Sequence, residues 1–399
     1  MTALRTLQAV ALALPLVWAA NAAPAALPIE HWTHASGARV YLVSSPAIPM
    51  LDVSVDVDAG SRRDPTTQAG LARATASMLD KGVQAAAGQP ALDENAVAEA
   101  WLDIGAQFGA SASSDRMSFS LRTLTDPALL ERAVALAARQ MAQPAFPAEV
   151  WARERERSLA ALREAETRPG THAGRAYAAA VYQGHPYGAQ TTAQTLQAIG
   201  VNDMAGFYRQ HVMACGARIS MVGAIDRATA DRIADRLLAA IAPNGCRSLA
   251  PVPEVAPLAA AKDERIPFAA AQAQVLLGQP GVRRDDPDFL TLLVGNHILG
   301  AGGFTSRLMD EVREKRGLTY GVYSSFSPGR HAGAFTVSLT TRPDQAEAAL
   351  ALSREVVARF VAEGPTDMEL QAAKDALIKG FALRLDSNRK LLDNVANIA

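Results

Sequence analysis

The segment VREKRGLTY, residues 312–320, contains two side chains that could act together on a carbonyl group. The guanidinium of Arg313 and the phenol of Tyr320 are both hydrogen-bond donors. Donors aimed at a developing oxyanion lower the barrier of acyl transfer. These two groups can cooperate only if the elements around them bring both to the same place.

A helix, a glycine cap and a strand are the elements predicted around this pair. Residues 305–315 indicate the helix, and Gly317 ends it because glycine adopts the left-handed cap conformation without steric cost. Residues 318–326 are rich in Tyr, Val, Thr and Ser, which favours a strand. Arg313 then falls in the last helical turn and Tyr320 at the start of the strand. A tight turn between them would bring both to one end of the unit.

The sequence pattern indicates that an α+β unit occurs twice along the chain. Residues 39–43 and 51–57 predict a first pair of strands, and the apolar and polar residues alternating along the second indicate a half-buried antiparallel sheet. A further alternating strand around Phe119 leads into a long amphipathic helix, and the second half repeats this order around Val337. We therefore predict two tandem domains, each a mostly antiparallel sheet covered by helices.

Composition predicts where these domains begin and end. Residues 1–22 have a basic start, a short apolar run and small residues at the end, as is typical of a cleaved secretory signal peptide. Residues 23–241 form the first predicted domain, and residues 242–267, rich in Pro and Ala, form an extended linker. The second domain is residues 268–399.

The second predicted domain lacks a counterpart of the strand and helix of residues 217–238. Either the sequence is truncated at its C-terminus or the protein lacks this element. In the latter case the neighbouring sheet edge would be left open or filled by another segment.

Charge and cysteine content narrow the class of protein. The formal net charge of -1 and the lack of basic clusters argue against nucleic-acid binding. No later segment is apolar for long enough to anchor the mature chain in a membrane. Cys215 precedes a predicted strand and Cys246 follows a helix that folds back along it, so a disulfide is expected in an exported protein; two free thiols are the alternative.

The VREKRGLTY segment and the tandem architecture resemble the pitrilysin and mitochondrial processing peptidase family, the inverzincin zinc peptidases. The resemblance implies that the two domains form half of a clam-shell chamber. Arg313 and Tyr320 would reach across that chamber to the zinc site of the other half. Gly302 and Gly303 resemble the family's glycine-rich loop, which implies contact with substrate; a plain turn is the alternative.

The catalytic motif of that family is degenerate in this chain. Active members carry H-x-x-E-H on the first helix, where two histidines bind zinc and the glutamate activates water. The stretch GLARATASMLDKG, residues 70–82, resembles the flanks of the motif but holds Arg73, Ala76 and Ser77 at its positions. The downstream ligand position aligns with Arg163, or with Glu164 after a slip of one residue. A lone carboxylate could not hold zinc, so no metal site is predicted in this chain.

Two functions fit these features. The first is a non-catalytic subunit of a heterodimeric periplasmic zinc metallopeptidase. Its homologous partner would carry H-x-x-E-H and the zinc, and Arg313 and Tyr320 would act on a peptide or unfolded protein bound there. This chain would then need no cofactor and would be no enzyme by itself. The alternative is a catalytically dead binding or scaffolding protein of the same fold, and a neighbouring gene for an exported H-x-x-E-H homologue would favour the first.

Overall fold

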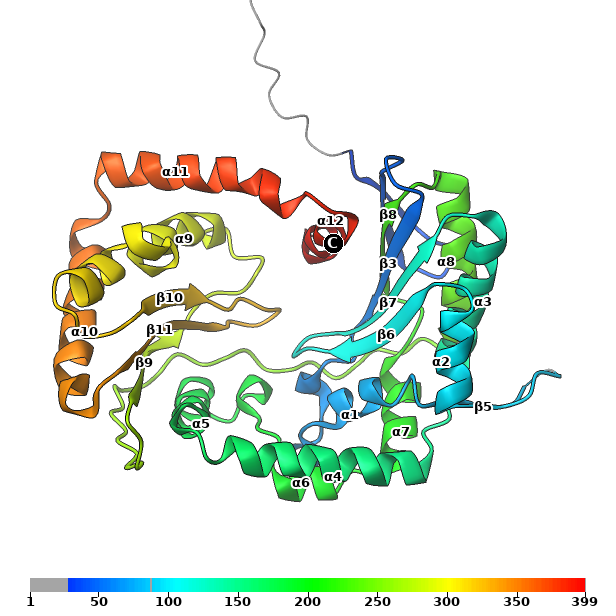
Figure 1. Ribbon diagram of the computed structural model, residues 1–399, viewed down its shortest axis with the longest axis horizontal. Helices are drawn as coiled ribbons and strands as arrows, with labels where there is room; N and C mark the ends of the chain where they lie inside the picture. The colour runs from blue at the N-terminus through cyan, green and yellow to red at the C-terminus, as the bar shows by residue number, and fades with distance from the viewer. Residues whose placement is uncertain (1–27, 87, 399) are drawn as a thin grey trace, which may run out of the picture.

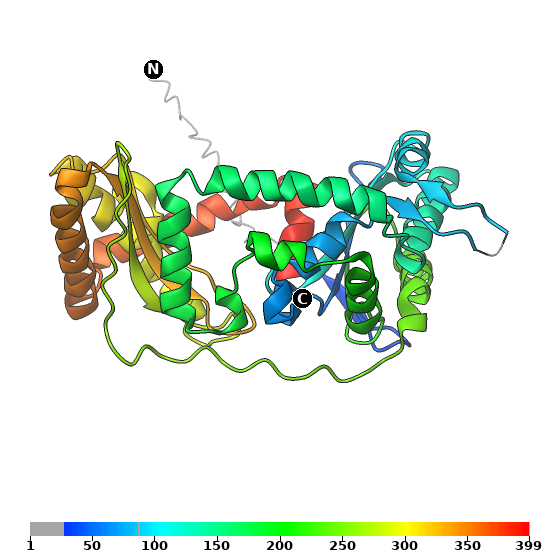
Figure 2. The same cartoon turned by 90° about the horizontal axis from the view of Figure 1, so that it is seen from below.

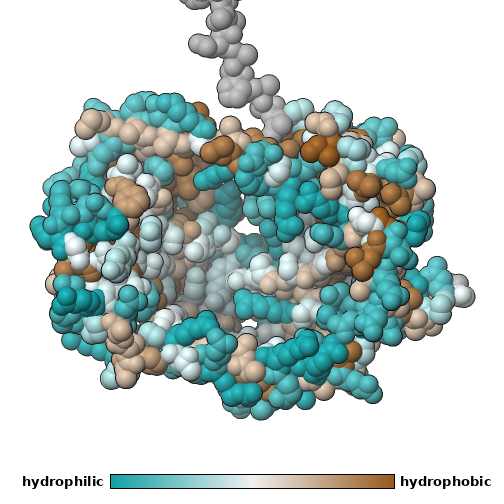
Figure 3. Space-filling model, in the orientation of Figure 1, coloured by the Kyte–Doolittle hydropathy of each residue, from teal (hydrophilic) through white to brown (hydrophobic). Residues whose placement is uncertain are grey.

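The computed structural model describes residues 28–86 and 88–398, so the predicted signal peptide lies outside the described residues. Two sheets stand on opposite sides of a central hollow (Figures 1 and 3). The first sheet contains, in spatial order, β1 (Glu30–Thr33), β2 (Arg39–Ser44), β8 (Arg218–Gly223), β3 (Met50–Val57), β7 (Met117–Leu124) and β6 (Gln107–Ala112). The second contains β10 (Val322–Phe326), β11 (Ala334–Thr341) and β9 (Ala273–Pro280). The mixed α+β class predicted from sequence is confirmed.

Helices cover the outer faces of both sheets and join them along two sides of the hollow (Figure 1). In the first part of the chain these are α1 (Leu71–Ser77), α2 (Glu94–Leu102), α3 (Pro127–Ala142), α4 (Ala148–Ala165), α5 (Pro169–Tyr182), α6 (Ala193–Gln197), α7 (Val201–His211) and α8 (Arg227–Ile241). In the second part they are α9 (Phe289–Asn296), α10 (Ala346–Glu363), α11 (Asp367–Phe381) and α12 (Asn388–Ile398). A small hairpin, β4 (Gly82–Val83) and β5 (Leu92–Asp93), projects from the first unit.

The predicted pairing of the first two long strands is wrong, because β8 lies between them. β8 is parallel to β2 and antiparallel to β3, with Val40 opposite Ile219 and Val53 opposite Met221. The reason is burial: all of β8 after Arg218 is buried, and the centre of the sheet is where such a strand removes most apolar surface from water. The apolar face of β3 packs into the main core beneath α3 and α8.

The second face of the first sheet is covered over β8 and β3, so the expectation of a half-buried strand is wrong for β3, whereas Ser120 and Leu124 on β7 are exposed. Asp52 and Asp56 on β3 are only 5% and 2% exposed. The covering element is α12, which comes from the far end of the chain and contacts both β8 and β3. Leu391, Leu392 and Val395 of α12 form a small apolar cluster with Val43 and Val222.

The cover is reciprocal, because α5 of the first unit packs against β9 of the second sheet. Tyr177 on α5 donates a hydrogen bond to the carbonyl oxygen of Phe335 at 2.9 Å and contacts Thr336 Oγ1 at 2.8 Å. α4 and α5 follow α3 in the same order as α11 and α12 follow α10. Each unit therefore sends a pair of helices across the hollow, and the second helix of the pair caps the other unit's sheet (Figure 1).

The second sheet packs its other face on α10 and on the π-helical segment η7 (Met309–Glu314), with Val337, Leu339 and Val356 in the core between them. Within the described residues, the outer edge of β9 has no strand partner, whereas the corresponding edge of β3 pairs with β8. The second sheet therefore ends at β9, whereas β8, β2 and β1 extend the first sheet beyond β3.

Residues 245–272 join the two units without a helix or strand. Figure 2 shows this segment running along one side of the molecule from α8 to β9. It is attached to the first unit, because Arg63 donates to the carbonyl oxygen of Ala250 and a ring nitrogen of His185 lies 2.9 Å from that of Pro253. A disulfide between Cys215 and Cys246, with Cα atoms 5.7 Å apart, ties the start of this segment to the start of β8.

None of the helices in the described ranges is long and apolar enough to cross a membrane.

Candidate functional site

The Arg313–Tyr320 segment folds close to the expected plan. Residues 303–305 form a turn of 3-10 helix, and the main helical segment is η7, which ends at Glu314. Gly317 has φ 62°, and the amide of Leu318 donates to the carbonyl oxygen of Val312 at 3.0 Å, which is the predicted glycine cap. The strand begins at Val322 rather than at residue 318. The intervening loop is held by Thr319, whose hydroxyl donates to the carbonyl oxygens of Gly321 and Thr340.

Arg313 and Tyr320 lie at the same end of the second unit but are differently held. The Arg313 guanidinium carbon is 4.6 Å from the centroid of the Phe304 ring, and its Nη1 lies 2.5 Å from the Glu314 carboxylate. Tyr320 is 87% exposed. The two side chains make no hydrogen bond to each other anywhere in the described structure. Tyr320 therefore presents a free phenol to whatever approaches this end of the molecule.

The glycine loop supports an aromatic side chain that sequence analysis missed. Gly303 has φ 64°, and a Cβ on Gly302 would come within 2.6 Å of the carbonyl oxygen of His297. The loop that these glycines permit carries Phe304, which is 65% exposed and lies against Arg313. The run GGFTS does contain an aromatic residue between turn-forming residues, and that was the only signal in the sequence.

The degenerate motif lies on α1. Arg73 and Ser77 are exposed, Ala76 is buried, and Arg163 is exposed on α4. Residues 28–86 and 88–398 contain no group of three or more His, Cys, Asp or Glu side chains that could hold a metal ion. The chemistry of Arg, Ala and Ser at these positions does not fit a zinc site.

The N-terminal end of α1 is organised by Asp64. Its carboxylate accepts hydrogen bonds from the amides of Gly70 and Ala72 at 2.8 and 2.9 Å. Burial nevertheless dominates and raises the pKa of Asp64 to about 6, because desolvation penalises the charged form more than the two amides favour it. α1 is therefore positioned by the Asp64 carboxylate.

A second polar cluster joins the two units, and we call it the interdomain junction: Asp58, Arg62, Asp115, Tyr187, Arg330 and His331. Asp115 is at its centre. Its carboxylate accepts from Tyr187 Oη at 2.6 Å and from the amide of Arg330 at 3.0 Å, and it lies 3.0 Å from Nε of the buried Arg62. Arg330 comes from the β10–β11 loop, so these bonds fix the second sheet to the first unit.

Two histidines flank the junction. The His185 and His331 rings are 5.2 Å apart, and His331 Nδ1 lies 3.1 Å from the Glu254 carboxylate of the connecting segment. Burial lowers the pKa of His185, and the neighbouring His331 lowers it further. A Cβ on Gly329 would lie 2.4 Å from Tyr187 Oη, so the loop approaches the first unit as closely as its backbone allows. Sequence analysis did not find this junction, because its members come from both units; Asp115 and Arg330, for example, are 215 residues apart.

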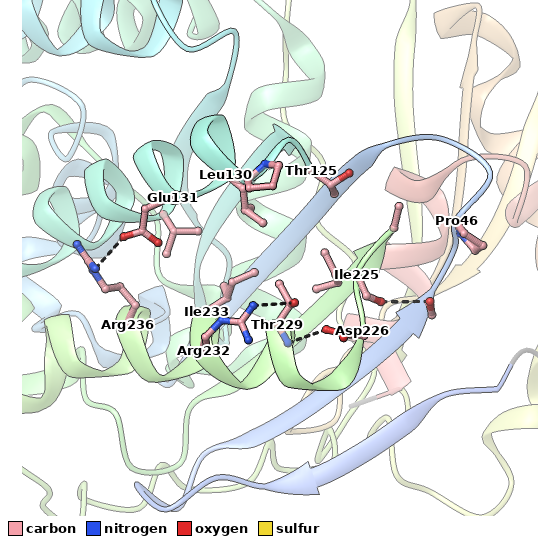
Figure 4. Close-up of a pocket in the computed structure, with 14 residues that line it drawn as sticks. Pro46, Thr125, Leu130, Glu131, Ile225, Asp226, Thr229, Arg232, Ile233 and Arg236 are labelled. Carbon is pink, nitrogen blue, oxygen red and sulfur yellow. Dashed lines mark hydrogen bonds and ion pairs between the residues drawn. The ribbon is translucent and has the colours of Figure 1, made fainter.

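An open groove lies between the N-terminal ends of α3 and α8, on the outer side of the first unit (Figure 4). Its charged side chains are already paired: Arg236 with Glu131 at 3.0 Å, and Arg232 with the Thr229 hydroxyl at 3.0 Å. Asp226 accepts from the Thr229 amide as the N-cap of α8. The groove therefore offers no convergent set of free polar groups, and it lies in the unit that does not carry Arg313 and Tyr320.

Comparison with known proteins places this fold and these residues in a family. Residues 39–195 match the family described as "Insulinase (Peptidase family M16)", and residues 198–377 match "Peptidase M16 inactive domain". The crystal structure of a peptidase M16 inactive domain from Pseudomonas fluorescens is 36% identical, with a TM-score of 0.85, over 92% of this chain and 86% of that chain.

Two further similarities extend the comparison. An uncharacterized zinc protease of Streptomyces coelicolor is 31% identical over 211 residues, which is 51% of this chain and 45% of the relative. The periplasmic protease PqqL from Escherichia coli shares the fold, with a TM-score of 0.73 at 19% identity over 93% of this chain and 40% of that chain.

The fold consists of two tandem α+β units, with the half-buried Arg313 and the exposed Tyr320 in the second. The chain belongs to peptidase family M16, the pitrilysin family, as the sequence resemblance predicted.

Proposed function

We propose that this chain is the non-catalytic subunit of a two-chain periplasmic zinc metallopeptidase. Its partner would be a homologous chain that carries H-x-x-E-H and binds the zinc. In the partner's site, the glutamate would serve as general base for the attack of water on a peptide carbonyl. This chain would close the chamber from the other side and contribute Arg313 and Tyr320.

The observation that carries the proposal is the exposure of Tyr320 next to a held arginine. A tyrosine that is 87% exposed contributes little to the core, and its phenol has no partner in the described structure. Arg313 is ordered by Phe304 and Glu314 on the same end of the unit. A phenol donating to the developing oxyanion would stabilise the transition state, while the guanidinium would hold either Tyr320 or the substrate backbone.

The degenerate α1 supports the same division of roles. Arg73, Ala76 and Ser77 cannot provide two zinc ligands and a base, so catalysis would depend on the partner's first unit. The relative whose structure is titled an inactive domain fits this role. The substrate would be a peptide or an unfolded small protein, added in extended form to a sheet edge inside the chamber.

Reconstitution tests the proposal. The mature chain is purified, its zinc content is measured, and its peptidase activity is assayed alone and after mixing with an H-x-x-E-H homologue from the same genome. We expect activity only in the mixture. Stoichiometric zinc together with cleavage by this chain alone would contradict the proposal.

Tyr320→Phe in the reconstituted pair tests the role of the phenol. Loss of one oxyanion donor costs on the order of 100-fold in turnover, roughly 3 kcal/mol, whereas assembly should be unchanged because no ring contact is lost. Co-elution in size-exclusion chromatography provides the control for assembly. Normal turnover by Tyr320→Phe would remove Tyr320 from the mechanism.

The second candidate is a binding or scaffolding protein of the same fold. It is compatible with the same observation, because a chain without a three-ligand metal cluster in residues 28–86 and 88–398 need not take part in catalysis. Inactivity of the mixture together with tight binding of the homologue would support this alternative.

A further inference from the structure

We propose that Phe304 is a positioning residue for Arg313: it holds the guanidinium against its ring so that Arg313 is oriented before substrate arrives. This inference rests on the proposed function. It adds Phe304 to the residues of the proposed site and assigns the glycine loop the role of placing Phe304. In this view Gly302 and Gly303 act mainly by placing Phe304, and contact between their own backbone and the substrate is not required.

Burial does not explain why Phe304 is where it is. Its side chain is 65% exposed, and it belongs to none of the apolar clusters of the described structure. Its one ring contact is with Arg313, whose guanidinium carbon lies 4.6 Å from the ring centroid. That distance is within the range of a cation–π interaction.

The loop that carries Phe304 is built to hold it there. Gly303 occupies the left-handed region at φ 64°, and Gly302 lies too close to His297 for any side chain. The Thr305 hydroxyl donates to the carbonyl oxygen of Gly302 at 3.1 Å, and the Ser306 hydroxyl donates to that of Gly303 at 2.7 Å. These bonds close the turn on both sides of Phe304, so the backbone fixes the direction in which the Cα–Cβ bond of Phe304 points.

Arg313 needs such a support because its other contact is local. The partner of its Nη1 is Glu314, the next residue in the chain, at 2.5 Å. An ion pair between adjacent side chains that are 30% and 49% exposed fixes a long arginine only weakly, since both side chains retain rotamer freedom. The planar guanidinium stacks well on an aromatic face, and stacking limits its orientation while leaving its N–H donors free at the edge.

The first test measures the position of Arg313 in the mature chain alone, so it does not depend on the partner. The probe is the Nε–H resonance of Arg313, assigned with Arg313→Lys. We expect a ring-current shift in the wild type that is lost in Phe304→Leu and kept in Phe304→Tyr. Thermal unfolding of both variants should match the wild type, because the ring is largely outside the core. An unchanged resonance in Phe304→Leu would overturn the inference.

The second test is a double-mutant cycle in the reconstituted peptidase. We expect Phe304→Leu to lower kcat/KM about fivefold, the equivalent of an exposed cation–π contact, and Phe304→Tyr to restore it. In the Arg313→Ala background, Phe304→Leu should have no further effect. Equal losses in both backgrounds would overturn the inference.

The two proposals fail in different ways. Full activity of Arg313→Ala would refute the role of Arg313 and with it the proposed function. A strong loss in Arg313→Ala with normal activity in Phe304→Leu would leave the proposed function intact and refute only the positioning role of Phe304.

Discussion

The interdomain junction and the Arg313–Tyr320 end use similar side chains in opposite ways. At the junction, Arg62 is 4% exposed and Asp115 accepts hydrogen bonds from both units. These charged groups are therefore paired with each other and hold the two units together. At the other end, Tyr320 is 87% exposed and Arg313 is held by one ring and one adjacent carboxylate. Polar groups that are fully paired stabilise the arrangement of the units. Polar groups left unpaired on an ordered backbone remain available to a ligand.

Contacts between the two units also determine how the two sheets are placed. Three contacts tie the units together: the β10–β11 loop at the junction, α5 against β9, and α12, whose C-terminal end is bound by Arg116 through the carbonyl oxygen of Ala396. Together they hold the two sheets relative to each other.

Breaking the junction should give the largest change in stability. Asp115→Ala leaves Arg62 with Asp58 as its remaining acidic partner and releases Tyr187 and the Arg330 amide. Removing one member of a buried ion pair should lower the free energy of unfolding by about 3 kcal/mol, measured by urea denaturation. Asp344→Ala, which removes an exposed carboxylate paired with Arg342, is the matched control and should change it by less than about 0.5 kcal/mol. Equal effects would show that the junction is not a tie.

A titration next to the junction should give an intermediate effect. Burial, together with the nearby positive charge of Arg63, lowers the pKa of His211 to about 4. The folded state therefore binds a proton less readily than the unfolded state. The stability that neutral His211 contributes is present above pH 6.5 and is lost as the pH falls towards 4.

His211→Gln tests this titration because glutamine does not ionise in that range. The stability difference between wild type and variant should shrink by about 2 kcal/mol between pH 7 and pH 4, followed by denaturation at each pH. A constant difference across the range would show that His211 is protonated equally in both states.

The smallest effect on stability is expected at the Arg313–Tyr320 end. Tyr320→Phe and Arg313→Ala should change the free energy of unfolding by less than about 0.5 kcal/mol, because neither change opens a cavity or strands a buried charge. Calorimetry of the isolated chain measures this directly. A loss as large as that of Asp115→Ala would mean that these side chains are structural and would remove the contrast between the two regions.

Local patterns predicted the elements well where the sequence alone decides them. A strand and a helix were predicted within residues 217–238, and β8 and α8 lie there because Asp226 caps the helix and apolar residues recur along one of its faces. The cap at Gly317 was also predicted, since a left-handed backbone favours glycine. The family could be inferred from VREKRGLTY because the spacing of Arg313 and Tyr320 is set within one short helix–turn–strand unit.

Contacts between distant residues could not be predicted in this way. The alternation in β3 indicated a polar face open to solvent, yet Asp52 and Asp56 are buried beneath α12, which belongs to the other end of the chain. β2 and β3 were paired by their order in the sequence, but the more apolar β8 separates them. In both cases the arrangement is stabilised by burying apolar surface against a segment that is distant in the sequence. The local alternation of apolar and polar residues cannot predict such a contact.

The sequence by itself determined the two α+β units, the glycine-capped turn that brings Arg313 and Tyr320 to one end, and the loss of the histidines that zinc would need. These properties depend on which residues are present and on their spacing within one helix or one strand and the turn that follows it. The tertiary structure alone decided which polar groups are consumed and which stay free: Asp115 meets Arg330 only when the two sheets are docked, and Phe304 meets Arg313 only when the glycine loop folds back. Packing between segments distant in the chain makes that division, because a polar side chain is paired or free only in relation to what the fold places beside it.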